Sequence, residues 1–309
     1  MPTFIPHSLY AQVITNLFII TLIIGGLIFL IVAGSVTYII FRFREKPGQA
    51  EPQQNFGQRK LEIAWTVAPG IILLVLFILT LKTMRQANPA AAQNPAQPDM
   101  VIIAHQWWWE VHYPKTGVVT ANEIHIPVGK AYYTRVESAD VIHDFWVPEL
   151  GPKVDAIPGH PNYRTIEADK AGTYLGTCAE YCGAQHAWMR IRVIAQSQAD
   201  FDAWTQAQLK VPQTPTSGLA ADGAKYFIQG ACVACHTIAG TNAKGNVGPD
   251  LTHVAERETI GSGVLDNTPG NLASWITNPQ AIKPGNHMPN LNLPPSEVQA
   301  LVAYLEALK

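Results

Sequence analysis

Two long stretches without charged side chains limit most strongly how this chain can fold. Neither residues 13–41 nor residues 63–81 contain a charged residue. A helix that crosses the hydrocarbon core of a bilayer needs about 20 predominantly apolar residues, and both stretches come close to or exceed that length. Only 14% of the 309 residues are charged and 48% are hydrophobic, which also suits a protein with a membrane part. We therefore predict a multidomain membrane protein whose residues 1–86 form a two-helix transmembrane hairpin.

The charges that flank the two spans predict their orientation. The connection between the spans carries a cluster of basic residues: Arg42, Arg44, Lys46, Arg59 and Lys60. On the other side only Lys82 and Arg85 lie near the membrane. Because basic residues are enriched in cytoplasmic loops, we expect the connection in the cytoplasm and both termini outside, in a bacterial cytoplasmic membrane.

Glu62 precedes the second apolar stretch directly. A carboxylate in the first turn of a helix is favoured by the helix dipole, so an ordinary interfacial role accounts for it. A role in proton uptake is the alternative, because ionisable groups at membrane depth often mark proton paths.

Two Pro-rich stretches divide the rest of the chain. Residues 87–98 (ANPAAAQNPAQP) and residues 211–217 (VPQTPTS) are uncharged and predict extended spacers. They delimit one domain at 99–210 and another at 218–309. The formal net charge of −2 gives no indication of a nucleic-acid partner.

The domain at 99–210 has the sequence pattern of an all-β fold. Short runs rich in Val, Ile, Thr, Tyr and Trp, such as EIHIP and AYYTRVES, alternate with Gly and Pro turns. About seven such runs in this length predict a Greek-key sandwich or barrel.

The last domain carries the sequence CVACH at 232–236, the attachment motif of a c-type heme. Cys232 and Cys235 would bond the two vinyl groups, and His236 would bind the iron. Met288 is the only methionine after the motif and is the expected ligand on the opposite side. His253 and His287 are the alternatives.

The same domain resembles the class I cytochromes c. The resemblance rests on CVACH, on GPDL at 248–251, on MPN at 288–290 and on a terminal amphipathic helix that we expect over about 296–308. Further helices are expected around 220–229 and 272–277. The resemblance implies an all-α fold in which Pro249 lies against His236.

A second cluster of metal-binding side chains lies at 178–189, CAEYCGAQHAWM. Cys178, Cys182, His186 and Met189 are soft or borderline ligands that favour copper. A mononuclear blue-copper site needs one thiolate, and a zinc site would leave Met189 without a role, whereas the extra thiolate makes two bridging sulfurs, and hence two coppers, possible. Disulfide bonds are the simplest alternative for the four cysteines. A second histidine is also needed, and the candidates are His105, His112, His125, His143 and His160, of which His143 stands best, at the start of a strand.

With HDFWVPEL at 143–150, this cluster resembles subunit II of cytochrome c oxidase and its binuclear Cu(A) site. The resemblance extends from the first span to about residue 195 and includes EIAWTVAP at 62–69, HQWWWE at 105–110 and KVDAIPGH at 153–160. It implies a cupredoxin-like domain. The implied copper ligands are His143, Cys178, the carbonyl of Glu180, Cys182, His186 and Met189. The carboxylate of Glu180 would face a magnesium ion at the border with the catalytic subunit.

The resemblance also implies two further roles. Trp107 would be the aromatic entry point for electrons at the protein surface, although tryptophans in a strand more often serve packing. Glu62 would lie near the mouth of a proton path in the catalytic subunit. His160 is a departure, since family members often have arginine there.

Together, the two resemblances imply subunit II of a caa-type heme–copper oxidase. Electrons would pass from an external donor, such as a cytochrome c or another periplasmic carrier, through heme c and Cu(A) to catalytic subunit I, where oxygen is reduced and protons are pumped. A membrane-anchored copper-binding or delivery protein is the alternative, but it leaves the heme motif unexplained. A quinol-oxidase subunit would lack the copper ligands, and a nitrous-oxide or nitric-oxide reductase component fits the two-span hairpin poorly.

Overall fold

The computed structural model describes residues 4–51, 53–54, 56–88 and 98–309, and these divide into two compact units. One unit comprises residues 12–87, and the other holds the N-terminal residues up to Ala11 together with everything from Asn88 onward. Most of the spacer predicted at 87–98 lies outside the described residues.

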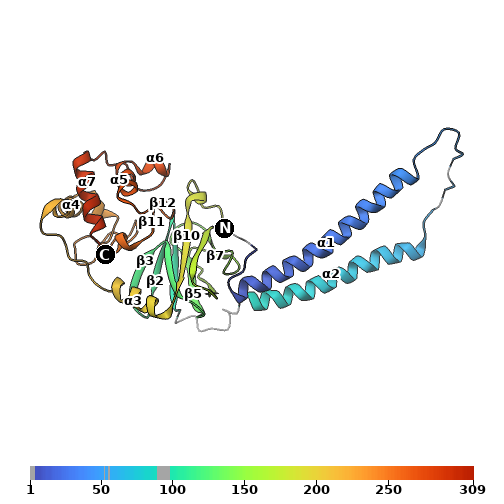
Figure 1. The fold of residues 1–309 in the computed structure, drawn as a ribbon, viewed down its shortest axis with the longest axis horizontal. Coiled ribbons are helices and arrows are strands. Elements are labelled where there is room, and N and C mark those ends of the chain that lie inside the picture. The colour runs from blue at the N-terminus through green and yellow to red at the C-terminus, as the bar shows by residue number, and fades with distance from the viewer. Residues whose placement is uncertain (1–3, 52, 55, 89–97) are drawn as a thin grey trace. The chain divides into compact units, whose positions relative to one another are not determined.

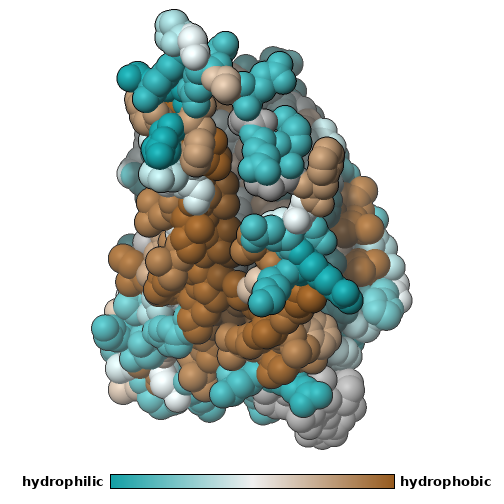
Figure 2. Space-filling model, turned by 90° about the vertical axis from the view of Figure 1, so that its right-hand side faces the viewer, coloured by the Kyte–Doolittle hydropathy of each residue, from teal (hydrophilic) through white to brown (hydrophobic). Residues whose placement is uncertain are grey.

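The first unit contains α1 (Leu9–Arg42) from residue 12 onward and all of α2 (Arg59–Ala87), two long helices joined by residues 43–58 (Figure 1). Both are long and apolar enough to cross a membrane, and the side chains of their apolar windows are not buried against other parts of the chain. Figure 2 shows hydrophobic residues gathered over these helices. Pro69 lies inside α2, where spanning helices tolerate proline. The expected helical hairpin is therefore present.

The second unit contains a sandwich of two five-stranded sheets. One sheet has the order β3-β2-β1-β5-β8 and the other β4-β10-β9-β6-β7. The strands are β1 (Met100–His105), β2 (Trp108–Tyr113), β3 (Val118–Ala121), β4 (Glu123–Pro127), β5 (Tyr132–Ser138), β6 (His143–Trp146), β7 (Val154–Ala156), β8 (Asn162–Ile166), β9 (Gly172–Cys178) and β10 (Arg190–Gln196). The pairs β1–β5 and β4–β10 are parallel, and the other pairs are antiparallel.

The alternation of side chains explains why these segments form a sandwich. In β1, Met100, Ile102 and Ala104 are fully buried while the residues between them are partly exposed. The sandwich has more strands than the seven expected, because some short neighbouring strands have no clear turn signal between them in the sequence. The chain passes from β3 to β4, and so from one sheet to the other, through the single residue Asn122 in a left-handed conformation (φ 63°).

Helix α3 (Gln198–Gln208) follows the last strand and was not expected from the strand pattern. Its start is capped by Ser197, whose hydroxyl accepts a hydrogen bond from the backbone N–H of Asp200. Phe201 and Trp204 of this helix pack on Tyr113, so α3 closes the open edge of the sandwich core.

The last 92 residues form a helical domain with a separate hydrophobic core. Its helices are α4 (Gly218–Gln229), α5 (Pro269–Thr277), α6 (Pro279–Ile282) and α7 (Pro295–Glu306), with a two-stranded ribbon of β11 (Thr259–Ile260) and β12 (Leu265–Asp266). Helices α4 and α7 cross closely because Gly223 faces the backbone of Ala300, where a Cβ atom would overlap the carbonyl. The fold class is therefore a two-helix hairpin, a cupredoxin-like β-sandwich and a helical cytochrome-like domain, as expected.

Candidate metal centre and heme pocket

The loop after β9 and the start of β6 meet at one end of the sandwich. Cys178 is the last residue of β9, and the short 3-10 helix η2 (His186–Trp188) leads through Met189 into β10. The backbone N–H of Cys178 donates to the carbonyl of Met189 at 2.9 Å, which closes this loop on itself. His143, the first residue of β6, faces the same loop.

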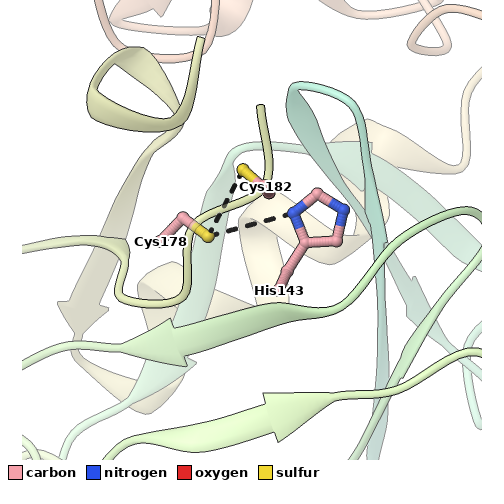
Figure 3. Close-up of side chains that lie close together, drawn as sticks. All are labelled: His143, Cys178 and Cys182. Atoms are coloured by element: carbon pink, nitrogen blue, oxygen red, sulfur yellow. Dashed lines mark hydrogen bonds between the residues drawn. The ribbon is translucent and has the colours of Figure 1, made fainter. Parts of the chain in front are cut away.

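Three side chains and one backbone carbonyl among the predicted ligands surround the two cysteine sulfurs. The Sγ atoms of Cys178 and Cys182 lie 3.7 Å apart, and Nδ1 of His143 lies 3.9 Å from Sγ of Cys178 (Figure 3). On the other side, Nδ1 of His186 lies 3.7 Å from Sγ of Cys182, and Sδ of Met189 lies 3.9 Å from the same sulfur.

The backbone carbonyl of Glu180 completes this arrangement, because its oxygen lies 3.2 Å from Sγ of Cys178. Glu180 is an exposed residue. Its backbone carbonyl faces the sulfurs, while its carboxylate is available at the surface. All six positions implied by the resemblance thus lie around one pair of sulfurs.

The sulfur–sulfur distance tests whether metal ions fit between the cysteines. A disulfide requires about 2.04 Å, far less than the observed separation. Thiolate sulfur lies about 2.3 Å from a bound ion such as zinc, so two sulfurs that share an ion at a near-tetrahedral angle stand roughly 3.8 Å apart. Both cysteines are buried, as are His143 and Met189, and the donors are thiolate, thioether and imidazole. This donor set fits copper.

The ionisable groups of the cluster shift one another's pKa values. Burial opposes a charge on His143, but hydrogen bonds with Asp140 and Cys178 outweigh it and raise the pKa of the imidazole. The sulfur–sulfur contact lowers the pKa of Cys178 and raises the pKa of Cys182. Cys178 is therefore the more readily ionised of the two thiols.

The remaining candidate histidines lie elsewhere in the sandwich. Nε2 of His105 and of His112 contact the carboxylate of Glu110 at 2.8 and 2.6 Å. His125 stacks on Trp204 with ring centroids 4.1 Å apart, and the exposed His160 pairs with Ile157 in an isolated bridge. Of the five candidates, the structure brings only His143 to the thiols.

The heme motif lines an apolar pocket in the described part of the chain. The pocket encloses about 1480 Å³ of atom-free space, part of it open to solvent, and Cys232, Cys235, His236 and Met288 all lie on its wall. The rest of its lining is mostly apolar, with Phe227, Leu301 and Leu305 among the residues. Thiols, imidazole and thioether facing one apolar pocket fit a covalently attached heme.

The orientation of His236 suits iron ligation. Its Nδ1–H donates to the carbonyl of Pro249 at 2.8 Å, which leaves Nε2 free to bind. Burial lowers the pKa of this imidazole and favours the neutral form that binds metals. Gly248 lies so close to the ring that an added Cβ would stand 2.6 Å from Cε1. GPDL therefore packs against His236.

The two alternative iron ligands occupy different surroundings. His287 lines the pocket beside Met288, but its ring lies against the indole of Trp107, with centroids 4.9 Å apart. His253 is not among the pocket-lining residues, and its Nδ1 lies 3.7 Å from a carboxylate oxygen of Glu256.

Trp107 is buried rather than presented on the surface. Only 8% of the residue is exposed, and it forms part of the heme pocket wall together with Gln106 and Trp108. Its indole Nε1–H donates to the carbonyl of Cys182 at 2.9 Å. Trp107 therefore contacts the heme domain with one end and the copper-ligand loop with the other.

The sequence patterns did not identify two residues that lie near these sites, Asp140 and Lys283. Asp140 accepts a hydrogen bond from Nε2 of His143, and its position three residues before a candidate ligand is a local signal that could have revealed it. Lys283 lies buried between the β-sandwich and the heme domain, and nothing in its neighbouring sequence marks it.

Comparisons with known proteins identify the family of each part of the chain. Models of the transmembrane domain and the periplasmic domain of cytochrome c oxidase subunit II match residues 7–83 and 116–196, and a cytochrome c model matches residues 220–309. Cytochrome c oxidase subunit 2 of Alkalihalophilus pseudofirmus is 36% identical over 98% of this chain and 90% of its own length. The chain belongs to the cytochrome c oxidase subunit II family. Its fused cytochrome c domain is the arrangement of caa3-type oxidases.

Two other relatives cover parts of this subunit II chain. Quinol oxidase subunit 2 of Bacillus anthracis is 30% identical over 65% of the chain and 70% of its own length. The crystal structure of the periplasmic domain of subunit II of cytochrome oxidase from Bradyrhizobium japonicum is 32% identical, with a TM-score of 0.35, and the match covers 36% of this chain and 94% of that one.

Membership of the family settles the general role of this subunit. It is a membrane-anchored component of a heme–copper oxidase and takes part in electron transfer alongside catalytic subunits. Its domains imply both copper and heme as cofactors.

Proposed function

We propose that this subunit is the electron-entry component of its oxidase. An external donor would deliver electrons to heme c, from which they would pass to a binuclear Cu(A) center and on to the oxygen-reducing, proton-pumping catalytic subunit. The observation that carries the proposal is the convergence of all six expected copper ligands around one pair of sulfurs, beside a pocket lined by the heme motif.

Each group of residues has a distinct task in this proposal. His143, Cys178, the Glu180 carbonyl, Cys182, His186 and Met189 would hold two copper ions. Cys232, Cys235, His236 and Met288 would hold the heme. When bound, these groups supply carriers that accept and release single electrons. The protein excludes water from the thiols and fixes the imidazoles, which limits rearrangement of the ligands when the charge changes.

Three further roles belong to the same proposal. The exposed carboxylate of Glu180 would contact a magnesium ion at the border with the catalytic subunit. Glu62, in the first turn of α2, would lie near the mouth of a proton path in that subunit. Trp107 would conduct electrons between the two metal sites rather than receive them at the surface, because the heme domain covers it.

The copper-to-iron ratio of the purified full-length chain tests the proposal directly. Two coppers per heme iron are expected, and Cys182→Ser should lose copper while keeping heme. Ala187→Ser, an exposed change in the same loop, is the matched control and should keep both. One copper or none per iron after copper loading would contradict the binuclear site.

A further inference from the structure

The β-sandwich and the heme domain share an interface built around a buried lysine. Lys283 lies just after α6 and is only 3% exposed. Its Nζ atom lies 3.3 Å from the carbonyl of Trp107, 3.1 Å from that of Trp188 and 3.1 Å from that of Gly261. An ammonium group has three N–H donors, so these three carbonyls satisfy it completely. Two of them belong to the β-sandwich, although Lys283 itself belongs to the heme domain.

A buried carboxylate makes the reciprocal contact from the β-sandwich. Glu123, the first residue of β4, is 2% exposed. It accepts hydrogen bonds from the backbone N–H of Thr259 at 2.8 Å, from its hydroxyl at 2.7 Å and from the backbone N–H of Glu258 at 3.0 Å. Arg192 also pairs with Glu258 at 2.9 Å. Each domain therefore buries a charged side chain in the other.

These contacts define one relative position of the two domains. Apolar surfaces can slide over each other at little cost, whereas a buried charge that leaves its partners unsatisfied pays the full desolvation penalty. Burial lowers the pKa of Lys283 to about 8, and the three carbonyl acceptors around Nζ favour the charged form. A small displacement would break hydrogen bonds at both Lys283 and Glu123.

The position that these two residues fix also brings the two candidate metal sites into contact. His287 directly precedes Met288, and its ring lies 4.9 Å from the ring of Trp107. Trp107 in turn donates to the carbonyl of Cys182 at 2.9 Å. A continuous series of bonded and touching groups thus leads from the expected iron ligand to an expected copper ligand.

We propose that Lys283 is a positioning residue that, with Glu123, keeps the heme domain docked on the β-sandwich with His287 against Trp107. This inference rests on the proposed function, because it assigns the interface to electron transfer between heme c and Cu(A). In that step one electron would pass from the reduced heme to the oxidised copper pair, with no proton or bond change. A domain that stays docked passes the electron without first diffusing to its acceptor.

Photoreduction of the full chain, loaded with heme and copper in detergent, tests this proposal. A photoexcited ruthenium complex with a sacrificial amine reduces the heme, and absorbance then follows electron arrival at copper. In the wild type we expect a rate that does not depend on solvent viscosity. Lys283→Met should lower the rate at least about tenfold and make it viscosity-dependent, because a buried set of acceptors loses its donor. Lys225→Met, at an exposed site on α4, is the matched control and should leave the rate unchanged.

Hydrogen exchange gives a readout that does not depend on electron transfer. In Lys283→Met, the amides of Glu258 and Thr259 should exchange faster, while amides inside β9 and β10 keep their protection. Glu123→Gln, which alters the interface from the other domain, should reproduce the slower and viscosity-dependent transfer even if Lys283→Met does not fold.

The possible outcomes separate the two proposals. If the wild type transfers electrons and both variants match its rate and viscosity independence, the positioning role of Lys283 is wrong. If the wild type shows no transfer from heme to copper, the proposed function fails. In that case unchanged exchange at Glu258 and Thr259 in Lys283→Met would overturn the docking role, and faster exchange would support it.

Discussion

Asp140 and His143 form a pair that orients a candidate copper ligand. Nε2 of His143 lies 2.8 Å from Oδ1 of Asp140, while Nδ1 of the same ring faces the sulfur of Cys178. Asp140 is itself held by the backbone N–H of Gln106 at 2.6 Å. Carboxylates in this position fix the ring and raise the basicity of the ligand nitrogen.

Replacing Asp140 with Asn should therefore weaken copper binding without removing a ligand. We expect a loss of about 10- to 100-fold in copper affinity, the range typical of such supporting groups. Competition with a copper chelator measures it on the full chain. Asp202→Asn, at an exposed site on α3, is the control and should bind copper like the wild type. Equal affinity in both variants would mean that Asp140 does not support the site.

Gly223 should be intolerant of any side chain. A Cβ atom there would overlap the carbonyl of Ala300, so Gly223→Ala forces α4 and α7 apart and should destabilise the heme domain by about 1–3 kcal/mol. For a domain of this size that corresponds to a fall in Tm of roughly 4 °C or more, followed by heme absorbance. Gly270→Ala, on α5 with open space around it, is the matched control and should keep the wild-type Tm. An unchanged Tm in Gly223→Ala would refute the close helix contact.

Acid should destabilise the β-sandwich partly through Glu110. Hydrogen bonds from His105 and then from His112 lower the pKa of this carboxyl to about 2, below its usual value of 4.5. A carboxyl with a lowered pKa in the folded state stabilises the fold above its unfolded pKa. That contribution is lost as the pH falls from about 4.5 to 2.

The variant Glu110→Gln isolates this effect. It should be less stable than the wild type at pH 6, by about 1–3 kcal/mol, and the difference should shrink toward pH 2. Urea unfolding followed by tryptophan fluorescence at several pH values measures it. A difference that stays constant between pH 6 and pH 2 would exclude Glu110 as the titrating group.

The sequence was sufficient to predict elements with a local signal. The charge-free stretches predicted α1 and α2, and the observed helices extend a few residues beyond each predicted span. The helix expected around 220–229 corresponds to α4 (Gly218–Gln229), because its apolar residues repeat at helical spacing. The grouping of Cys178, Cys182, His186 and Met189 was visible because all four lie within one turn-rich segment.

Contacts between distant segments could not be predicted in this way. Lys283 lies 176 positions from Trp107 along the chain, and no local pattern relates the two. The strand count was too low in part because β3 and β4 are separated only by Asn122, whose left-handed conformation has no strong sequence mark. The resemblance implied a surface position for Trp107, whereas the turn between β1 and β2 that holds it is covered by the heme domain, a contact that no local sequence pattern marks.

The orientation in the membrane gives the last prediction. The basic connection between α1 and α2 should face the cytoplasm, because positively charged loops are retained there. A cysteine introduced by Ala50→Cys should therefore react with a membrane-impermeant maleimide in inverted vesicles and stay unlabelled in intact spheroplasts. Thr216→Cys, at an exposed position in the spacer before the heme domain, is the matched control and should show the opposite pattern, with the parent chain measuring the background of its four native cysteines. Labelling of Ala50→Cys in spheroplasts would reverse the orientation and place both candidate metal sites in the cytoplasm, where an external donor has no access.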